Sequence, residues 1–227
     1  MPVRDLEIPT DLSAFFEDPF YLPTYDDVVE RFNDHDGMWG YLGAQMGAQG
    51  MFFCEYYTRE YIEGLAEHLM QRADANQETI VLEVGAGAGR LSRFLGGAIT
   101  HPNVTIIPTD LSDGRMYPGV EAIDYKQALQ KYEPSVVLSA WMPFQSDWTA
   151  VFRQTPSVME YVLIGEAGPG SASGTDATWD SIMLAADGFT MNQLSSLARY
   201  QLSLMTSFES GEALCHSTTV SFLRNTD

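Results

Sequence analysis

The stretch that determines the fold runs from Val81 to Leu91 and reads Val-Leu-Glu-Val-Gly-Ala-Gly-Ala-Gly-Arg-Leu. The apolar run at residues 79–84 predicts a buried strand, and the apolar residues after Arg90 recur at helical spacing. Three glycines between these elements permit a tight turn and a close backbone approach. The start of the helix offers free backbone amides, so the stretch predicts a ligand-binding corner made of strand, loop and helix.

Two residues in this stretch narrow the choice of ligand. Arg90 occupies the position of the third glycine in a dinucleotide fingerprint, and no Gly-Lys-Ser/Thr follows as in a P-loop. Glu83 lies inside the predicted strand, where an acid is unfavourable beside a pyrophosphate but favourable beside a cation in a partly desolvated site. Glu83 could instead be a structural acid that caps the loop. The stretch therefore favours a positively charged ligand over a nicotinamide cofactor.

Six further runs predict the rest of a sheet. They lie at residues 104–109, 120–123, 136–140, 161–164, 201–207 and 218–223. Strands that alternate with helices indicate an α/β fold, a doubly wound and mostly parallel sheet with helices on both faces. The last two runs have no helix signal between them, and we expect them to form an antiparallel hairpin at one edge.

Two of these strands lead directly into an aspartate. Asp110 follows the second strand and Asp124 follows the third. At such positions Asp110 could accept hydrogen bonds from ribose hydroxyls, and Asp124 could accept one from an adenine amino group. Either residue alone could instead cap a helix or a turn. Their joint placement at successive strand ends favours a nucleoside site.

The stretch from Val81 to Leu91, followed in order by Asp110 and Asp124, resembles the first motif and the following acids of class I S-adenosylmethionine-dependent methyltransferases. The resemblance covers roughly residues 79–223. It implies a Rossmann-like sheet of seven strands in the order 3-2-1-4-5-7-6, with the last strand antiparallel. It also implies S-adenosylmethionine as the cofactor, which carries an ammonium and a sulfonium group.

The same resemblance implies the residues that hold the cofactor. The methionine portion would contact the loop, the ribose would contact the end of the second strand, and the adenine would contact the end of the third. The expected residues are Glu83, Gly85, Ala86, Gly87, Gly89, Asp110, Leu111, Asp124 and Tyr125, with Ala140 and Trp141 closing the pocket.

The acceptor side of the pocket is predicted from aromatic and polar residues near the strand ends. Methyltransferases that act on exocyclic amines often have Asn/Asp-Pro-Pro-aromatic after the fourth strand, whereas this chain has only Pro143-Phe144 in register and Trp141 in place of the Asn or Asp. The aromatic rings could form a wall for a flat or cationic acceptor, or could be ordinary packing. The expected substrate pocket comprises Trp39, Tyr57, Trp141, Phe144, Gln145 and Glu166.

Two residues are candidate bases, Glu166 and His216, although Glu166 could equally be a solvated loop acid and His216 an ordinary histidine. An amine acceptor needs no dedicated base, so the sequence does not require a catalytic residue.

Composition limits the partners. The chain of 227 residues has 12 basic and 31 acidic residues, a formal net charge of −19. Nucleic-acid binders need a basic footprint, so we expect a neutral or cationic small-molecule acceptor rather than DNA or RNA. We expect a cytoplasmic protein, since there is no apolar run of 18 residues and no secretory signal. The spacing of Cys54 and Cys215 predicts no metal site.

The sequence therefore predicts an N-terminal helical segment over residues 1–75, which forms a cap on the substrate pocket, and a cofactor-binding core over residues 76–227. The leading hypothesis is a small-molecule methyltransferase that acts on nitrogen or oxygen, possibly in secondary metabolism. Two alternatives stay open: a non-methylating rearrangement or cyclisation on the same fold, and methylation of a protein. The sequence does not indicate the oligomeric state.

Overall fold

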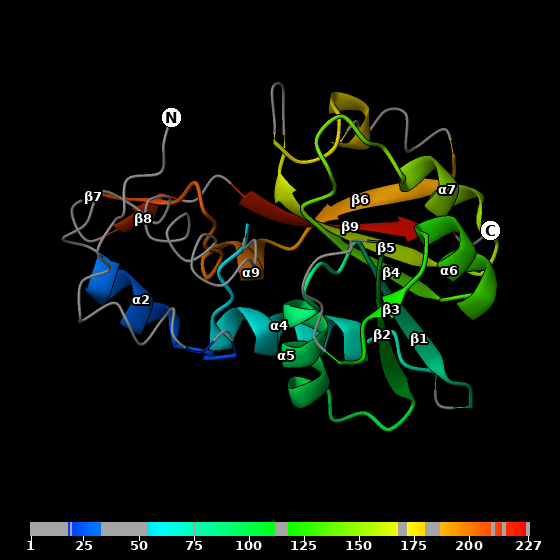
Figure 1. Ribbon diagram of the computed structural model, residues 1–227, viewed down its shortest axis with the longest axis horizontal. Helices are drawn as coiled ribbons and strands as arrows, with labels where there is room; N and C mark the ends of the chain where they lie inside the picture. Colours follow the sequence, from blue (N-terminus) through cyan, green and yellow to red (C-terminus); the bar gives the residue numbers. More distant parts are fainter. Residues whose placement is uncertain are drawn as a thin grey trace.

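A computed structural model describes residues 18, 20–32, 54–74, 76–111, 118–167, 172–179, 187–209, 212–214 and 217–225 of the chain. Its centre is a seven-stranded sheet (Figure 1). The strands of this sheet are β1 (Thr79–Val84), β2 (Val104–Asp110), β3 (Glu121–Ala122), β4 (Val136–Ala140), β5 (Glu160–Glu166), β6 (Phe189–Gln193) and β9 (Ser217–Arg224).

The order of strands across the sheet is β3-β2-β1-β4-β5-β9-β6. Strands β1 to β5 pair in parallel, and β9 pairs antiparallel with both β5 and β6. Because β9 is the seventh strand of this sheet along the chain, the expected order 3-2-1-4-5-7-6 with an antiparallel last strand is confirmed. The carboxyl ends of β1, β2 and β4 therefore lie along one edge.

Helices cover both faces of the sheet. On one face, α4 (Arg59–Met70), α5 (Arg90–Ala98) and α9 (Ser195–Ala198) share a core with alternate residues of β1, β4 and β5. On the other face, α6 (Tyr125–Tyr132) and α7 (Thr149–Gln154) pack against the intervening residues of the same strands (Figure 1). Residues 136–138 show the alternation that buries both faces of a strand, since Val136 and Leu138 face the first core and Val137 faces the second.

The prediction of the antiparallel pair at the edge of the sheet is right for one strand, residues 218–223, and wrong for the other. The partner of β9 is β6 rather than residues 201–207. Residues 201–204 are buried, but they lie beside residues 54–56, to which they are joined by a single bridge between Glu55 and Ser203. The apolar character of this run reflected burial against a neighbouring segment and not membership of the sheet.

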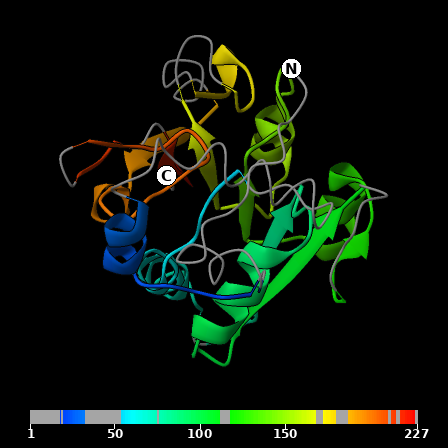
Figure 2. The same cartoon turned by 60° about the vertical axis from the view of Figure 1, so that its left-hand side comes forward.

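The described N-terminal part contains α2 (Tyr25–Phe32) and α4. Thr58 caps α4 by accepting a hydrogen bond from the backbone nitrogen of Tyr61. Phe32 of α2 stacks on Phe208 at 5.8 Å between ring centres, which places α2 beside the hairpin of β7 (Ser207–Glu209) and β8 (Glu212–Leu214) (Figure 2). The expected boundary between residues 75 and 76 stays a prediction.

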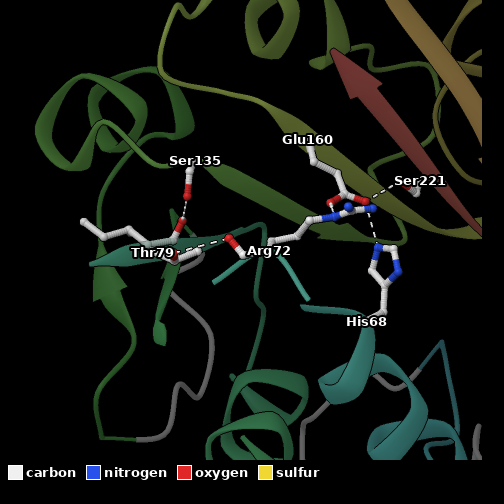
Figure 3. Close-up of polar contacts among 7 residues, drawn as sticks. His68, Arg72, Thr79, Ser135, Glu160 and Ser221 are labelled. Atoms are coloured by element: carbon white, nitrogen blue, oxygen red, sulfur yellow. Dashed lines mark hydrogen bonds and ion pairs between the residues drawn. The ribbon is translucent and has the colours of Figure 1, made fainter. Parts of the chain in front are cut away.

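A buried carboxylate, that of Glu160, links α4 to the sheet (Figure 3). Glu160, at the start of β5, lies 2.7 Å from Nε2 of His68 and 2.5 Å from Nε of Arg72, and it accepts a hydrogen bond from Ser221 of β9. These contacts join one helix and two strands through a single side chain.

Candidate functional site

The corner between β1 and α5 has the local geometry that its glycines allow. Gly85, Gly87 and Gly89 have φ values of 69°, 55° and 83°, a region that side chains strongly disfavour. The backbone nitrogen of Ala86 donates to the carbonyl of Thr109 at 3.0 Å. This bond fixes the loop against the end of β2, so the turn is held by its own strands.

Glu83 is buried beneath this loop. Its Oε2 accepts hydrogen bonds from the backbone nitrogen of Ser92, at 3.1 Å, and from the Ser92 hydroxyl. Burial raises the pKa of Glu83 to about 7, against the lowering effect of these hydrogen bonds. Glu83 thus has the structural capping role that the sequence left open, and it also faces a cavity.

Asp110 and Asp124 occupy the strand ends at which they were expected. The backbone nitrogen of Gly87 donates to Oδ2 of Asp110 at 2.6 Å, which joins the loop to β2. Asp124 caps α6, because its Oδ1 accepts from the backbone nitrogen of Lys126 at 2.9 Å. Asp124 is therefore a helix cap, the alternative raised from the sequence, and at the same time it lines a cavity.

Two cavities meet at the carboxyl edge of the sheet. The first, here called the loop cavity, encloses about 190 Å³ and is lined by Cys54, Glu55, Tyr57, Glu83, Gly85, Ala86, Gly87, Ala88, Arg90, Leu91, Ala140 and Trp141. The second, here called the strand-end cavity, encloses about 360 Å³ and is lined by Gly85, Asp110, Leu111, Ile123, Asp124, Tyr125, Ala140, Trp141, Met142, Pro143 and Trp148. They share Gly85, Ala140 and Trp141, so one elongated ligand could occupy both.

Two tryptophans shape these cavities. Trp141 has a φ of 53°, an uncommon conformation for a large side chain, and its indole nitrogen donates to Oε2 of Glu55 at 2.8 Å. Trp148 stacks on Tyr125 with 4.8 Å between ring centres. A flat apolar surface therefore lies beside Asp124 in the strand-end cavity.

The structure brings most of the expected cofactor residues together. All of them line one of the two cavities except Gly89, which forms the N-terminal boundary of α5 instead. Of the expected substrate residues, Tyr57 and Trp141 line the loop cavity. Trp39 and His216 lie outside the described residues.

Three of the other expected pocket residues do not line either cavity. The side chain of Phe144 is 63% exposed, and Gln145 is exposed with its backbone nitrogen bonded to Gly174. Glu166 is half-buried, and its Oε2 accepts from the backbone nitrogen of Ala172 at 3.0 Å. Phe144 and Gln145 follow β4 and Glu166 is the last residue of β5, but none of the three lines either of the described cavities.

Glu55 is one of the cavity-lining residues that sequence reasoning missed, as are Arg90 and Trp148. Glu55 stands in Cys-Glu-Tyr-Tyr, directly before a predicted helix, and no motif marks it. In the fold its side chain is only 3% exposed and lines the loop cavity together with the glycines.

Among the described residues no group of three or more histidines, cysteines or acids is arranged to bind a metal.

Comparison with known proteins gives matches in structure but not in sequence. No protein-family model and no curated protein matches the sequence. Among solved structures, the carbon methyltransferase CurJ aligns at 14% identity and a TM-score of 0.50, over 88% of this chain and 58% of its own. An O-methyltransferase family protein from Burkholderia thailandensis aligns at 11% identity and a TM-score of 0.48, over 89% of this chain and 63% of its own.

The DszA carbon methyltransferase aligns at 13% identity and a TM-score of 0.46, over 71% of this chain and 51% of its own. The chain thus spans a little over half the length of the carbon methyltransferase CurJ. The likeness to CurJ and the observed strand order agree on the architecture. The chain therefore has the Rossmann-like fold of the class I S-adenosylmethionine-dependent methyltransferases.

Proposed function

We propose that the chain is an S-adenosylmethionine-dependent methyltransferase that acts on nitrogen or oxygen of a small molecule. The observation that carries this proposal is the pair of cavities that meet at Gly85, with the carboxyl of Glu83 in one and that of Asp110 in the other. Their volumes, about 190 and 360 Å³, are together in the range typical of small-molecule sites, about 300–1,000 Å³.

The residues of the two cavities fit the chemistry of this cofactor. In the loop cavity, the carboxyls of Glu55 and Glu83 suit an ammonium and a sulfonium group, and the guanidinium of Arg90 suits a carboxylate. In the strand-end cavity, Asp110 suits ribose hydroxyls, and the apolar surface beside Asp124 suits an adenine ring. The loop also leaves room for a cofactor. A Cβ added at Gly87 would meet no atom within 4 Å, so the space beside this residue is open.

When bound, the cofactor supplies a methyl group on a sulfonium, which is already a good leaving group. The protein contributes by holding the reactants in line and by excluding water, which is worth roughly 7–11 kcal/mol in well-oriented reactions. The side chains that line the loop cavity serve this purpose here: Tyr57 and Leu91 are buried, and Trp141 is half-buried.

The choice of a small neutral or cationic acceptor rests on the net charge of −19, which disfavours polyanions such as nucleic acids. Among the described helices none is long and apolar enough to cross a membrane. A location in the cytoplasm stays a prediction.

Calorimetric titration with S-adenosylmethionine and, separately, with NAD tests the proposal. We expect S-adenosylmethionine to bind and NAD to give no heat of binding. Failure to bind S-adenosylmethionine would reject the proposal. Methyl-labelled cofactor then separates methyl transfer from a rearrangement or cyclisation, because only transfer leaves the label in the product.

A further inference from the structure

The segment around Glu55 is fixed by backbone contacts from a distant part of the chain. The backbone nitrogen of Tyr56 donates to the carbonyl of Leu202, and that of Leu204 donates to the carbonyl of Cys54, both at 2.8 Å. These bonds place the segment against residues 201–204 and direct the Glu55 side chain into the loop cavity. Its position is therefore set by the fold and not by a mobile loop.

The carboxyl of Glu55 is held by donors from separate elements. Nε1 of Trp141, after β4, donates to Oε2 at 2.8 Å, and the hydroxyl of Ser217, at the start of β9, donates to Oε1 at 3.0 Å. Each carboxyl oxygen of Glu55 is thus held in place by its own donor. The carboxyl lies at the end of the sheet where ligands bind in open α/β folds.

The charged and titratable groups around Glu55 differ in whether they can exchange a proton near neutral pH. Burial raises the pKa of Glu55 to about 8, although the hydrogen bonds from Trp141 and Ser217 lower it. Burial also raises the pKa values of Cys54 and Tyr57 well above the neutral range, so both stay uncharged. Among the described residues that line the loop cavity, this leaves Glu55 and Glu83 as the groups that exchange a proton, beside the permanent charge of Arg90.

The charge of the cavity lining is opposite to that of the proposed cofactor, an inference that rests on the proposed function. With an ionised methionine portion and a sulfonium, S-adenosylmethionine has a net charge of one positive unit, and loss of the methyl group removes that unit. When Glu55 and Glu83 are both ionised and Arg90 is charged, the lining has one negative unit. The cationic cofactor and the ionised Glu55 therefore neutralise each other in a site that solvates isolated charge poorly.

We propose that Glu55 is the proton acceptor of this site: it is protonated in the free protein, ionises when the cationic cofactor binds, and takes the proton that the acceptor loses. An acceptor hydroxyl that forms a bond to the methyl carbon must lose its proton. The electrons of the broken carbon–sulfur bond stay on the sulfur, and the proton moves to a carboxylate oxygen of Glu55. The net charge of the cavity is then zero before and after the reaction.

Proton release on ligand binding tests the proposal without knowledge of the acceptor. The heat of binding of S-adenosylmethionine at pH 7 is measured in buffers of different ionisation enthalpy, which yields the number of protons released. A carboxyl with a pKa of about 8 is about 90% protonated at pH 7, so its ionisation releases about 0.9 proton. S-adenosylhomocysteine has the same amino and carboxylate groups but no sulfonium, and we expect it to release fewer protons.

The variant Glu55→Gln keeps the size of the side chain and one oxygen that can accept from Trp141, but it cannot ionise. We expect it to release about 0.9 proton fewer than the wild type and to lose preference for S-adenosylmethionine over S-adenosylhomocysteine. Glu63→Gln, at an exposed position of α4, is the matched control and should behave as the wild type does. At pH 9 the wild type itself should release little from Glu55, which gives a check independent of any variant.

The possible outcomes separate this proposal from the proposed function. Equal proton release by the wild type and Glu55→Gln, with both binding the cofactor, would overturn the role of Glu55 and leave the methyltransferase proposal standing. No binding of S-adenosylmethionine by the wild type would instead reject the proposed function, and the role of Glu55 with it.

Discussion

Asp110 lies where the glycine loop, β2 and the strand-end cavity meet. Its carboxyl accepts the backbone hydrogen of Gly87 at 2.6 Å and faces the space proposed for the ribose. We expect Asp110→Ala to weaken S-adenosylmethionine binding about 10- to 100-fold, since hydrogen bonds to charged groups contribute about 1.5–3 kcal/mol each. Asp187→Ala removes a half-exposed acid outside both cavities and should leave affinity unchanged. An unchanged affinity in Asp110→Ala, measured by calorimetry, would remove this residue from the site.

The role of the single residue Glu55 could not be predicted from the sequence around it. Glu83 and Asp110 could be predicted because each stands at a fixed place relative to a strand and a loop. The chemistry of Glu55 arises from Trp141 and Ser217, which are 86 and 162 positions away in the chain. Only the folded chain brings these donors to one carboxyl.

Among the elements, the turn between β1 and α5 depends on Gly85. A Cβ at this position would lie 3.0 Å from the ring of Trp148, and the φ of 69° is costly for any other residue, by about 1–2 kcal/mol. We expect Gly85→Ala to lower the melting temperature and to weaken cofactor binding, because Trp148 would shift within the strand-end cavity.

The matched control for this turn is Gly96→Ala in α5, where an added Cβ meets nothing within 4 Å. Helix propensity alone predicts that this change stabilises the protein by about 0.8–1 kcal/mol. Thermal unfolding of both variants measures the two effects. A Gly85→Ala protein as stable as the wild type, with full cofactor affinity, would contradict the described turn.

Glu160 joins α4 to β5 and β9, and its removal tests that attachment. Burial acts to raise its pKa, but the hydrogen bonds from His68 and Ser221 and the charges of His68 and Arg72 outweigh burial and lower it. A lowered pKa stabilises the fold above the unfolded value, about 4.5, and this stability is lost as the pH falls through the folded value.

We therefore expect Glu160→Gln to lower the free energy of unfolding by about 3 kcal/mol at pH 7. The variant should also lose less of its remaining stability than the wild type does when the pH falls below about 4.5. Denaturant unfolding across this range measures both. Glu121→Gln, which breaks the exposed pair with Lys131, should have little effect. Parallel acid-unfolding curves for Glu160→Gln and the wild type would refute the argument.

The elements also show the limits of reading strands from composition. The strand β4 has the bounds that its apolar run predicted. Both of its faces are buried, so its residues form one continuous apolar run in the sequence. The edge strand β6 was missed, since only its first residue, Phe189, is buried. The prediction of a strand over residues 201–207 is wrong because burial selects apolar residues in any buried segment, such as residues 201–204, whether or not the segment pairs in a sheet.

For the whole molecule, the net charge of −19 means that the folded chain repels itself. Raising sodium chloride from about 10 to about 150 mM shortens the screening length from about 30 to about 8 Å. We expect a rise in melting temperature of roughly 3 °C, equivalent to about 1 kcal/mol. The rise should be largest below 150 mM, as measured by calorimetry in a salt series. A melting temperature that falls or stays constant over this range would contradict it.

The central claim is that one cofactor spans the two cavities that meet at Gly85. A crystal structure of the protein with S-adenosylhomocysteine tests this most directly. The account predicts the methionine portion in the loop cavity beside Glu83, and the ribose hydroxyls within about 3.2 Å of the carboxyl of Asp110. A ligand bound elsewhere, or one whose ribose makes no contact with Asp110, would contradict it.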